Sequence, residues 1–270
     1  MHPMLNTAIR AARRAGNILL RNADRLDRLA VETKGHNDFV TEVDRLAERE
    51  IIEILHRAYP NHAILAEESG EQHAGSEYCW IIDPLDGTTN FLHGYPHYAV
   101  SIALQHKGRL EQAVIFDPHR NELFTATRGQ GAYLNDRRIR VSQTHDFRRA
   151  LLGTGFPFRS QTYIDLWIAV FKRVAGETSG VRRAGSAALD LAHVACGRFD
   201  GFWEFGLKPW DMAAGCLLIE EAGGMLGDPA GGQQHLTTGL IVAGNPKIYI
   251  ELVKHTRACL PPDWEKAFSR

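Results

Sequence analysis

The sequence predicts a layered fold of the mixed α/β (α+β) class, in which helices cover the faces of β-sheets. Three observations predict it: two amphipathic helices open the chain, an antiparallel meander fills its middle, and strands alternate with helices after about residue 150. We therefore expect a single fold over residues 1–270, with an N-terminal α+β half at 1–145 and a C-terminal α/β half at 146–270.

Apolar residues at helical spacing predict the two opening helices. Their apolar faces are Leu5, Ile9, Ala12, Ala15 and Leu19 in the first helix, and Val43, Ala47, Ile51, Ile54 and Leu55 in the second. Thr41 followed by Asp44 predicts a capping box with Asp in place of the usual Glu, and Pro60 ends the second helix. Asp44 is therefore expected in a first helical turn.

Strands and helices of ordinary length are predicted in the rest of the chain. Short strands are expected at 63–68 and 80–83, and the meander covers 98–141 with turns at KGR, DPHRN and GQG. Further strands are expected near 150–155, 199–205, 223–228 and 240–245, and helices near 162–174, 186–196, 210–222 and 246–258.

Charge and composition exclude several classes of protein. Lys and Arg number 31 against 32 Asp and Glu, so a net charge of -1 gives no overall field that would attract nucleic acid or an anionic membrane. The N-terminus lacks the apolar core of a signal peptide, and no run of 18 apolar residues occurs. We therefore expect a cytoplasmic protein without a membrane partner. The 4 cysteines form no CxxC pair and are too few for a disulfide scaffold.

An acidic bend follows one of the predicted strands. In WIIDPLDGTTNF, residues 80–91, Asp83 and Asp86 lie around a proline, and Gly87 and Thr88 follow. One interpretation is a plain turn, because Asp, Pro, Gly and Asn all favour turns. The other is a metal site, in which two carboxylates face a cation while the amides of Gly87 and Thr88 face an anion.

Two further acids occupy similar places in the predicted fold. Glu67 ends the strand AILAEE, and Asp211 lies at the head of an apolar helix, where it could simply cap the helix. With Asp83 and Asp86, these residues supply four negative charges, enough for two divalent cations. Oxygen ligands favour Mg²⁺ over Zn²⁺, and Mg²⁺ commonly keeps positions for water and substrate phosphate. The conjunction predicts a phosphatase.

Other motif-based functions fit the sequence poorly. Asp83 does not start an EF-hand, because the ladder of acids is absent, and Gly94 and Pro96 interrupt the His93 and His97 pair, which has no HExxH context. The chain has no GxSxG nucleophile elbow. The stretch GTGFPF lacks the third glycine and the acid of a dinucleotide fingerprint.

The motifs as a set resemble those of the inositol monophosphatase family. The stretches that carry the resemblance are WIIDPLDGTTNFLH, WDMAAGCLLIEEAGG, KGHNDFVTEVD, EES, RRAGSAALDLA and IVAGNP, which together span nearly the whole chain. The match is closest to bacterial inositol-1-monophosphatases of the extragenic-suppressor type. The resemblance implies one catalytic fold, an αβαβα five-layer sandwich of the sugar-phosphatase type, assembled as a homodimer.

The resemblance also implies a set of site residues. The matching metal ligands are Glu67, Asp83, the carbonyl of Leu85, Asp86 and Asp211, for two Mg²⁺ ions per subunit and up to three. The matching substrate-binding residues are Leu85, Asp86, Gly87, Thr88, Gly185, Ser186, Ala187, Glu204 and Asp211. Glu67, Thr88 and Asp44 match the catalytic residues that orient the attacking water. From the residues alone, Ser186 could equally be a helix N-cap and Glu204 an exposed strand residue.

The implied activity is a Mg²⁺-dependent, lithium-sensitive phosphomonoesterase that hydrolyses inositol 1-phosphate and related sugar or polyol phosphates with metal-activated water. Relatives use the same carboxylates on fructose 1,6-bisphosphate or 3'-phosphoadenosine phosphates, so these substrates stay open as alternatives. The loop from Lys34 to Asp44 is about one residue shorter than in animal members, which leaves open the occupancy of a third metal site.

A second function of a different class is also implied, because close bacterial relatives associate with RNA polymerase in ribosomal RNA antitermination. Three arginine pairs are the candidate contacts: Arg137 and Arg138, Arg148 and Arg149, and Arg182 and Arg183. They could also be solvated surface or dimer salt bridges. Since the net charge is near zero, a protein partner is favoured over direct binding of nucleic acid.

Overall fold

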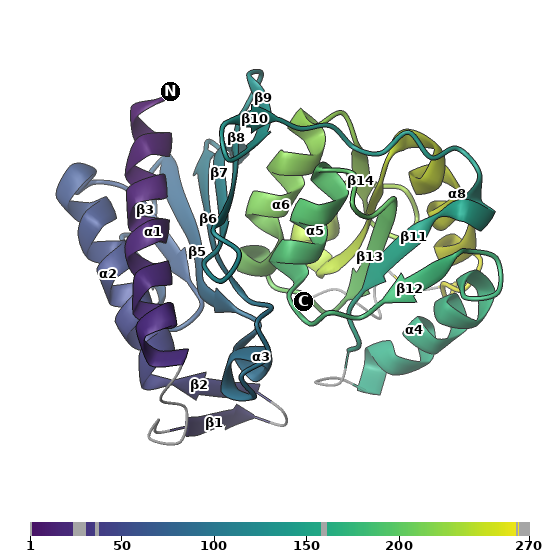
Figure 1. Cartoon of the computed structure of the whole chain (residues 1–270), viewed down its shortest axis with the longest axis horizontal. Helices are drawn as coiled ribbons and strands as arrows, with labels where there is room; N and C mark the ends of the chain where they lie inside the picture. The colour runs from purple at the N-terminus through teal and green to yellow at the C-terminus, as the bar shows by residue number, and fades with distance from the viewer. Residues whose placement is uncertain (1, 24–30, 36–37, 158–160, 263, 265–270) are drawn as a thin grey trace.

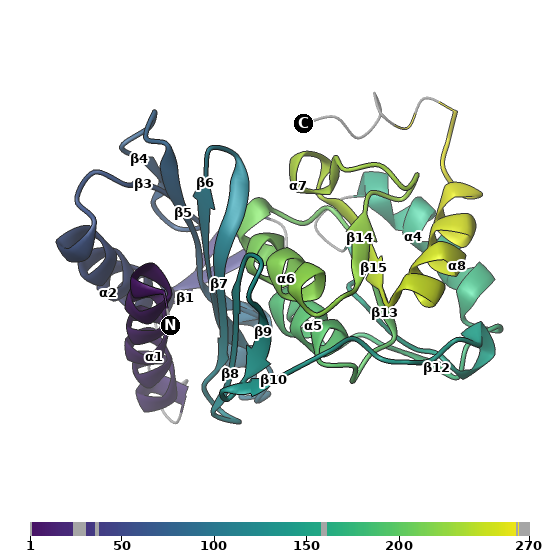
Figure 2. The same ribbon diagram turned by 90° about the horizontal axis from the view of Figure 1, so that it is seen from above.

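Three helix layers alternate with an eight-stranded and a five-stranded β-sheet across the molecule (Figures 1 and 2). The computed structural model describes residues 2–23, 31–35, 38–157, 161–262 and 264. The order of the layers is α1 and α2, an eight-stranded sheet, α5 and α6, a five-stranded sheet, and α4 and α8. This αβαβα sandwich confirms the predicted fold class.

The first helix layer matches its sequence prediction closely. It consists of α1 (Pro3–Ala23) and α2 (Glu42–Ala58). The predicted capping box is present, because the Thr41 side chain accepts from the Asp44 N–H while the Asp44 carboxylate accepts from the Thr41 N–H at 2.9 Å. The stretch before α2 differs from the predicted loop, since β1 (Val31–Gly35) and β2 (Asp38–Thr41) form an antiparallel pair. Strands this short carry too few residues for a clear alternation.

The eight-stranded sheet contains the predicted meander. Its order is β10-β9-β8-β7-β6-β5-β3-β4, with β5 to β10 antiparallel neighbours and β3 parallel to β5. The strands are β3 (Ala63–Ala66), β4 (Gly70–Gln72), β5 (Tyr78–Asp86), β6 (Ala99–His106), β7 (Arg109–Asp117), β8 (Glu122–Thr127), β9 (Gly131–Leu134) and β10 (Arg137–Arg138).

The five-stranded sheet has the order β12-β11-β13-β15-β14 and is mixed, because β11 runs parallel to β12 and β13 while β15 runs antiparallel to β13 and β14. Its strands are β11 (Leu151–Thr154), β12 (Gly180–Arg182), β13 (Gly201–Phe205), β14 (Met225–Gly227) and β15 (Leu240–Gly244). The helices around it are α4 (Gln161–Val174), α5 (Ala187–Ala195), α6 (Pro209–Glu221) and α8 (Pro246–Arg257). These four helices confirm the sequence predictions to within one or two residues. The sequence analysis missed only short pieces such as β12, α3 (Thr88–Leu92) and α7 (His235–Thr238).

Alternating residues along the strands connect the layers. In β5, Trp80 and Ile82 pack with α1 and α2, whereas Ile81 packs with α5 and α6. In β13, Phe202 faces the α5 and α6 layer, and Trp203 packs with α4 and α8. The period of two along each strand therefore gives every sheet two buried faces, and α5 and α6 are buried between the sheets. None of the helices within the described part of the chain is long and apolar enough to cross a membrane.

Candidate active site

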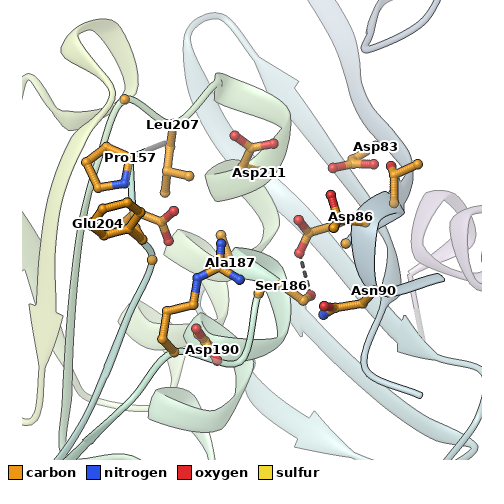
Figure 3. Close-up of a pocket in the computed structure, with 18 of the residues that line it drawn as sticks. Asp83, Asp86, Asn90, Pro157, Ser186, Ala187, Asp190, Glu204, Leu207 and Asp211 are labelled. Atoms are coloured by element: carbon orange, nitrogen blue, oxygen red, sulfur yellow. Dashed lines mark hydrogen bonds between the residues drawn. The ribbon is translucent and has the colours of Figure 1, made fainter. Parts of the chain in front are cut away.

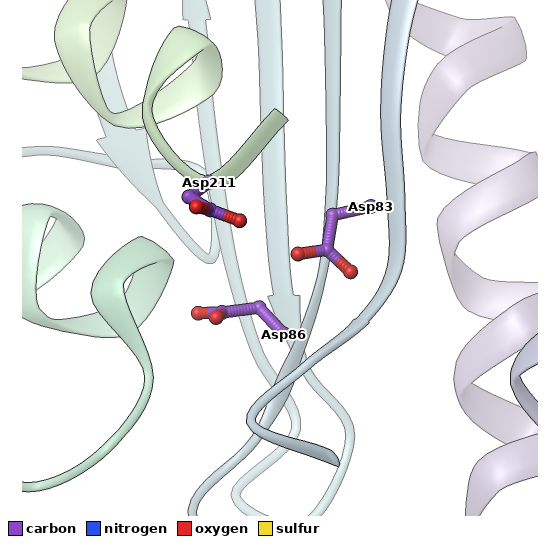
Figure 4. Close-up of side chains that lie close together, drawn as sticks. All are labelled: Asp83, Asp86 and Asp211. Atoms are coloured by element: carbon purple, nitrogen blue, oxygen red, sulfur yellow. The ribbon is translucent and has the colours of Figure 1, made fainter. Parts of the chain in front are cut away.

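The end of β5 turns two carboxylates toward the middle helix layer. The pairing of β5 with β6 shifts register between Asp83 and Asp86, which marks a bulge at the proline. In a regular strand, residues three apart point to opposite faces, so the irregularity is what lets both acids face α6 (Figure 4). The bend is fixed from within, because the Leu85 N–H donates to Asp83 Oδ1 at 2.9 Å.

The third carboxylate comes from the first turn of α6. Pro209 begins this helix, and Asp211 Oδ2 accepts a hydrogen bond from the Lys208 N–H at 2.6 Å. Asp211 thus caps its own helix, as one interpretation predicted, and also faces β5. Carboxylate oxygens of Asp83, Asp86 and Asp211 lie within 4.8 Å of one another, and we call these three residues the acidic cluster (Figure 4).

Glu67 lies beside the acidic cluster. It follows β3, the parallel neighbour of β5, and its N–H donates to the Ile82 carbonyl at 3.2 Å. Burial raises the pKa of Asp83 well above its usual range, and the charge of Glu67 raises that pKa further, followed by the charges of Asp86 and Asp211. The cluster therefore concentrates negative charge in a buried place, which is the electrostatic setting of a cation site.

The short helix α3 starts directly after the acidic bend. Gly87 precedes it with φ of 96°, a left-handed conformation that favours glycine, and a Cβ there would lie 3.1 Å from the His97 carbonyl oxygen. The Thr88 hydroxyl lies 3.2 Å from Asp44 Oδ1 and 3.1 Å from the Leu85 carbonyl oxygen. A residue of the outer layer, Asp44 on α2, thus touches a residue of the cavity.

Asp86 connects the eight-stranded sheet to the middle helix layer. Its Oδ2 accepts a hydrogen bond from the Ser186 hydroxyl at 2.5 Å (Figure 3) and a second one from the Ala188 N–H at 2.8 Å. Ser186 is also the N-cap of α5, since its side chain accepts from the Leu189 N–H. The helix-cap interpretation of Ser186 is therefore confirmed, and the same hydroxyl fixes the orientation of the Asp86 carboxylate.

One cavity brings almost every site residue of the sequence analysis together (Figure 3). The residues of that set that line it are Glu67, Asp83, Leu85, Asp86, Gly87, Thr88, Gly185, Ser186, Ala187, Glu204 and Asp211. Asp44 does not line the cavity and reaches it through Thr88. Glu204 is half-buried in the cavity wall, so its interpretation as a plain exposed strand residue was wrong.

One end of the cavity holds charged residues that the sequence analysis did not assign to the site. Asp190 on α5 is buried, and its pKa is raised well above its usual range by burial, and further by the charges of Glu204 and Asp86. Arg183 lines the same end and opposes this shift. An acid with apolar neighbours on both sides in the stretch AALDLAHVA was the signal that could have identified Asp190.

Comparison with known proteins agrees with this geometry. The inositol monophosphatase family matches residues 1–260. The Nus factor SuhB of Pseudomonas aeruginosa is 54% identical over 271 residues, which cover 98% of this chain and 100% of that protein. The crystal structure of the extragenic suppressor protein suhB from Bartonella henselae superposes with a TM-score of 0.92 at 44% identity, over 95% of this chain and 99% of that chain.

The inositol monophosphatase from Anabaena gives a TM-score of 0.83 at 41% identity, over 96% of both chains. Sequence and architecture thus agree along nearly the full length, and the resemblance inferred from the motifs is confirmed. The chain belongs to the inositol monophosphatase family.

Proposed function

We propose that this protein is a cytoplasmic, homodimeric, Mg²⁺-dependent phosphomonoesterase that hydrolyses inositol 1-phosphate and related sugar or polyol phosphates. Family membership supports a phosphatase. The observation that carries the proposal is the acidic cluster, in which carboxylates from β5 and α6 lie within 4.8 Å of one another. Like charges gathered in a buried place cost free energy of folding, and a cation offsets that cost.

The donor set fits Mg²⁺ by its chemistry. Carboxylates are hard oxygen ligands, and Glu67 and the Leu85 carbonyl add further oxygens beside the acidic cluster. We assign Glu67, Asp83, Leu85, Asp86 and Asp211 as ligands for two ions, and for up to three. Bound Mg²⁺ supplies positive charge for the phosphoryl oxygens and makes a water molecule easier to deprotonate.

Thr88 and Asp44 are suited to orient that water. The Thr88 hydroxyl can donate its single proton to Asp44 Oδ1, 3.2 Å away, and its oxygen can then accept a hydrogen bond from a water in the cavity that Thr88 lines. Burial raises the pKa of Asp44, while hydrogen bonds from Thr41 and Thr88 oppose that shift. We propose that Glu67, which lines the same cavity beside the acidic cluster, orients the attacking water together with Thr88.

The remaining cavity residues hold the substrate. The N–H groups of Gly87 and Thr88 at the start of α3 can donate to phosphoryl oxygens. Glu204 on β13 lies across the cavity, where its carboxylate can accept hydrogen bonds from hydroxyl groups of a polyol (Figure 3). This arrangement separates a phosphate end near β5 from a leaving-group end near β13.

Substitution of Gly155 tests whether Glu204 recognises the leaving group. A Cβ at this position would lie 1.8 Å from Glu204 Oε1, so Gly155→Ala must push the carboxylate from its place. We expect kcat/KM for inositol 1-phosphate to fall about tenfold, the cost of losing one hydrogen bond to a charged group. Hydrolysis of p-nitrophenyl phosphate, which has no polyol, should stay unchanged.

Gly176→Ala is the matched control, because a Cβ at Gly176 meets nothing within 4 Å. Equal losses on both substrates in Gly155→Ala would show a general disturbance of the site and would remove Glu204 from leaving-group recognition.

A substrate screen tests the proposed activity itself. Phosphate release should be measured with inositol 1-phosphate, fructose 1,6-bisphosphate and 3'-phosphoadenosine 5'-phosphate, each with Mg²⁺, with chelator and with added lithium. We expect the highest kcat/KM on inositol 1-phosphate, no release with chelator, and inhibition by lithium. Release that persists in chelator would contradict the metal-dependent mechanism. A higher kcat/KM on either of the other two substrates would leave the metal-dependent mechanism intact, and it would show that inositol 1-phosphate is not the preferred substrate.

A second candidate function is supported by the names of the relatives. The protein from Pseudomonas aeruginosa, 54% identical, is called a Nus factor, a name that belongs to the transcription machinery. We propose that this chain also binds RNA polymerase or an antitermination factor through exposed arginines such as Arg137, Arg138, Arg148 and Arg149. Charged surface residues of this kind favour encounter with an acidic protein surface.

Co-purification with RNA polymerase separates the two functions. We expect the Asp86→Asn variant to be retained as well as the wild type, because Arg137, Arg138, Arg148 and Arg149 do not line the cavity. Charge reversal at Arg137 and Arg138 should weaken retention. If the wild type is retained and Asp86→Asn is not, the second function depends on catalysis. If the wild type itself is not retained, the second function is ruled out.

A further inference from the structure

Helix α2 carries two buried acids that contact segments adjoining the candidate active site. Asp44 and Glu48 are four residues apart, so they share one face of the helix, and both are almost fully buried. Asp44 contacts the Thr88 hydroxyl. The hydrogen bonds of Glu48 go to a different segment, and no role was expected for it from the sequence.

Glu48 binds the backbone directly after Glu67. Its Oε2 accepts from the Glu68 N–H at 2.8 Å, and its Oε1 accepts from the Ser69 N–H at 2.9 Å. Both carboxylate oxygens are therefore used on two consecutive peptide groups. Burial raises the pKa of Glu48, and the hydrogen bond from Glu68 opposes this shift most strongly, so these bonds favour the ionised form.

The segment that carries Glu67 is consequently held on both sides. The Glu67 N–H donates to the Ile82 carbonyl of β5, one residue before Asp83, and the next two N–H groups donate to Glu48. A rotation of this segment would have to break at least one of these bonds. These three bonds therefore hold the backbone from which the Glu67 side chain reaches Asp83.

We propose that Glu48 is a positioning residue that holds Glu67 in place for the metal site, an inference that rests on the proposed function. Without Glu48, the segment loses two charge-assisted hydrogen bonds, and Glu67 must be ordered when the ion binds. Groups that hydrogen-bond to metal-binding residues and orient them typically contribute ten- to a hundredfold to metal affinity. The loss should therefore appear in Mg²⁺ binding before any substrate is added.

The test is titration calorimetry of Mg²⁺ into the full chain, with thermal unfolding of the same samples. In Glu48→Gln, the side-chain amide N–H₂ replaces one acceptor and faces a backbone N–H, and we expect Mg²⁺ affinity to weaken about tenfold or more. The matched control is Asp228→Asn. Asp228 is also buried and accepts from the Ala230 and Gly232 N–H groups, both at 2.9 Å, but it does not line the cavity.

If Glu48 only stabilised the fold, Glu48→Gln would behave like the Asp228→Asn control, with a lower unfolding temperature and a nearly unchanged Mg²⁺ affinity. Asp228→Asn should lower the unfolding temperature and leave Mg²⁺ affinity within about twofold of the wild type, because only a remote loop is loosened. If Glu48→Gln binds Mg²⁺ as tightly as the wild type, or weakens it no more than Asp228→Asn does, the proposal is overturned.

Glu48→Asp keeps the test decisive where Glu48→Gln does not fold. This variant retains the charge and shortens the side chain by one methylene, so a weaker Mg²⁺ affinity supports the positioning role and an unchanged affinity contradicts it. A wild-type protein that binds no Mg²⁺ at all overturns the metal-dependent function, which is a result distinct from a failure of Glu48 alone.

Discussion

Replacing Asp86 by Asn should reduce phosphate release at least about a hundredfold while the protein stays folded. The Asn oxygen can still accept from the Ser186 hydroxyl and the Ala188 N–H, the two bonds that join Asp86 to α5. The charge that faces the acidic cluster is lost, so the site holds a cation less tightly. The measurement is kcat/KM on inositol 1-phosphate, with circular dichroism and thermal unfolding as evidence of the fold.

Asp200→Asn provides the control for this prediction. Asp200 is buried and accepts from the Leu151 N–H at 2.7 Å, but it does not line the cavity. It should lose stability and keep its activity. A folded Asp86→Asn protein that hydrolyses the substrate at nearly the wild-type rate would remove Asp86 from the proposed site.

Replacing Asp83 by Asn should change thermal stability in opposite directions without and with Mg²⁺. Without metal, the variant should be more stable than the wild type, because burial and three neighbouring carboxylates disfavour the ionised form of Asp83. A gain of about 1 kcal/mol raises the unfolding temperature of a chain this size by about 2–4 °C. The Asn oxygen can still accept from the Leu85 N–H, so the bend is retained.

With Mg²⁺, the order should reverse. An ion present at a hundred times its dissociation constant stabilises the wild type by about 2.7 kcal/mol, and the variant should gain little because a ligand is missing. Thermal unfolding across a Mg²⁺ titration measures both effects. An Asp83→Asn protein that is less stable without metal and keeps the full response to Mg²⁺ would contradict the assignment of the acidic cluster as a cation site.

Residues at the ends of elements were the ones that could be found from the sequence. Asp83, Asp86, Glu67 and Asp211 stand where an apolar strand ends or an apolar helix begins, and the structure brings all four to one cavity. Their convergence could not be read from spacing, because it depends on β3 pairing with β5 and on α6 lying between the two sheets. The pattern alone suggested a shared site for these four acids but did not show it, and the family resemblance then assigned them as metal ligands.

Residues inside elements were missed for a physical reason. Glu48 stands in a helix rich in charged residues, where an acid is normally solvated, and only the tertiary structure shows that it is buried against the β3 loop. Asp190 lies instead in the largely apolar helix α5, where the acid was a usable signal that the sequence analysis did not follow. Gly155, in the stretch GTGFPF, was assigned no role, because its importance lies in its contact with the side chain of Glu204, which approaches from another strand. Sequence patterns reflect the neighbours of a residue along the chain, and they do not show its tertiary contacts with residues distant in sequence.

The most direct test of the central claim is a crystal structure of this protein grown with Mn²⁺ in place of Mg²⁺, with anomalous diffraction to locate the ions. Our account predicts an anomalous peak within about 2.5 Å of carboxylate oxygens from Asp83, Asp86 and Asp211. An active, Mn²⁺-dependent enzyme whose ions all lie elsewhere would contradict it.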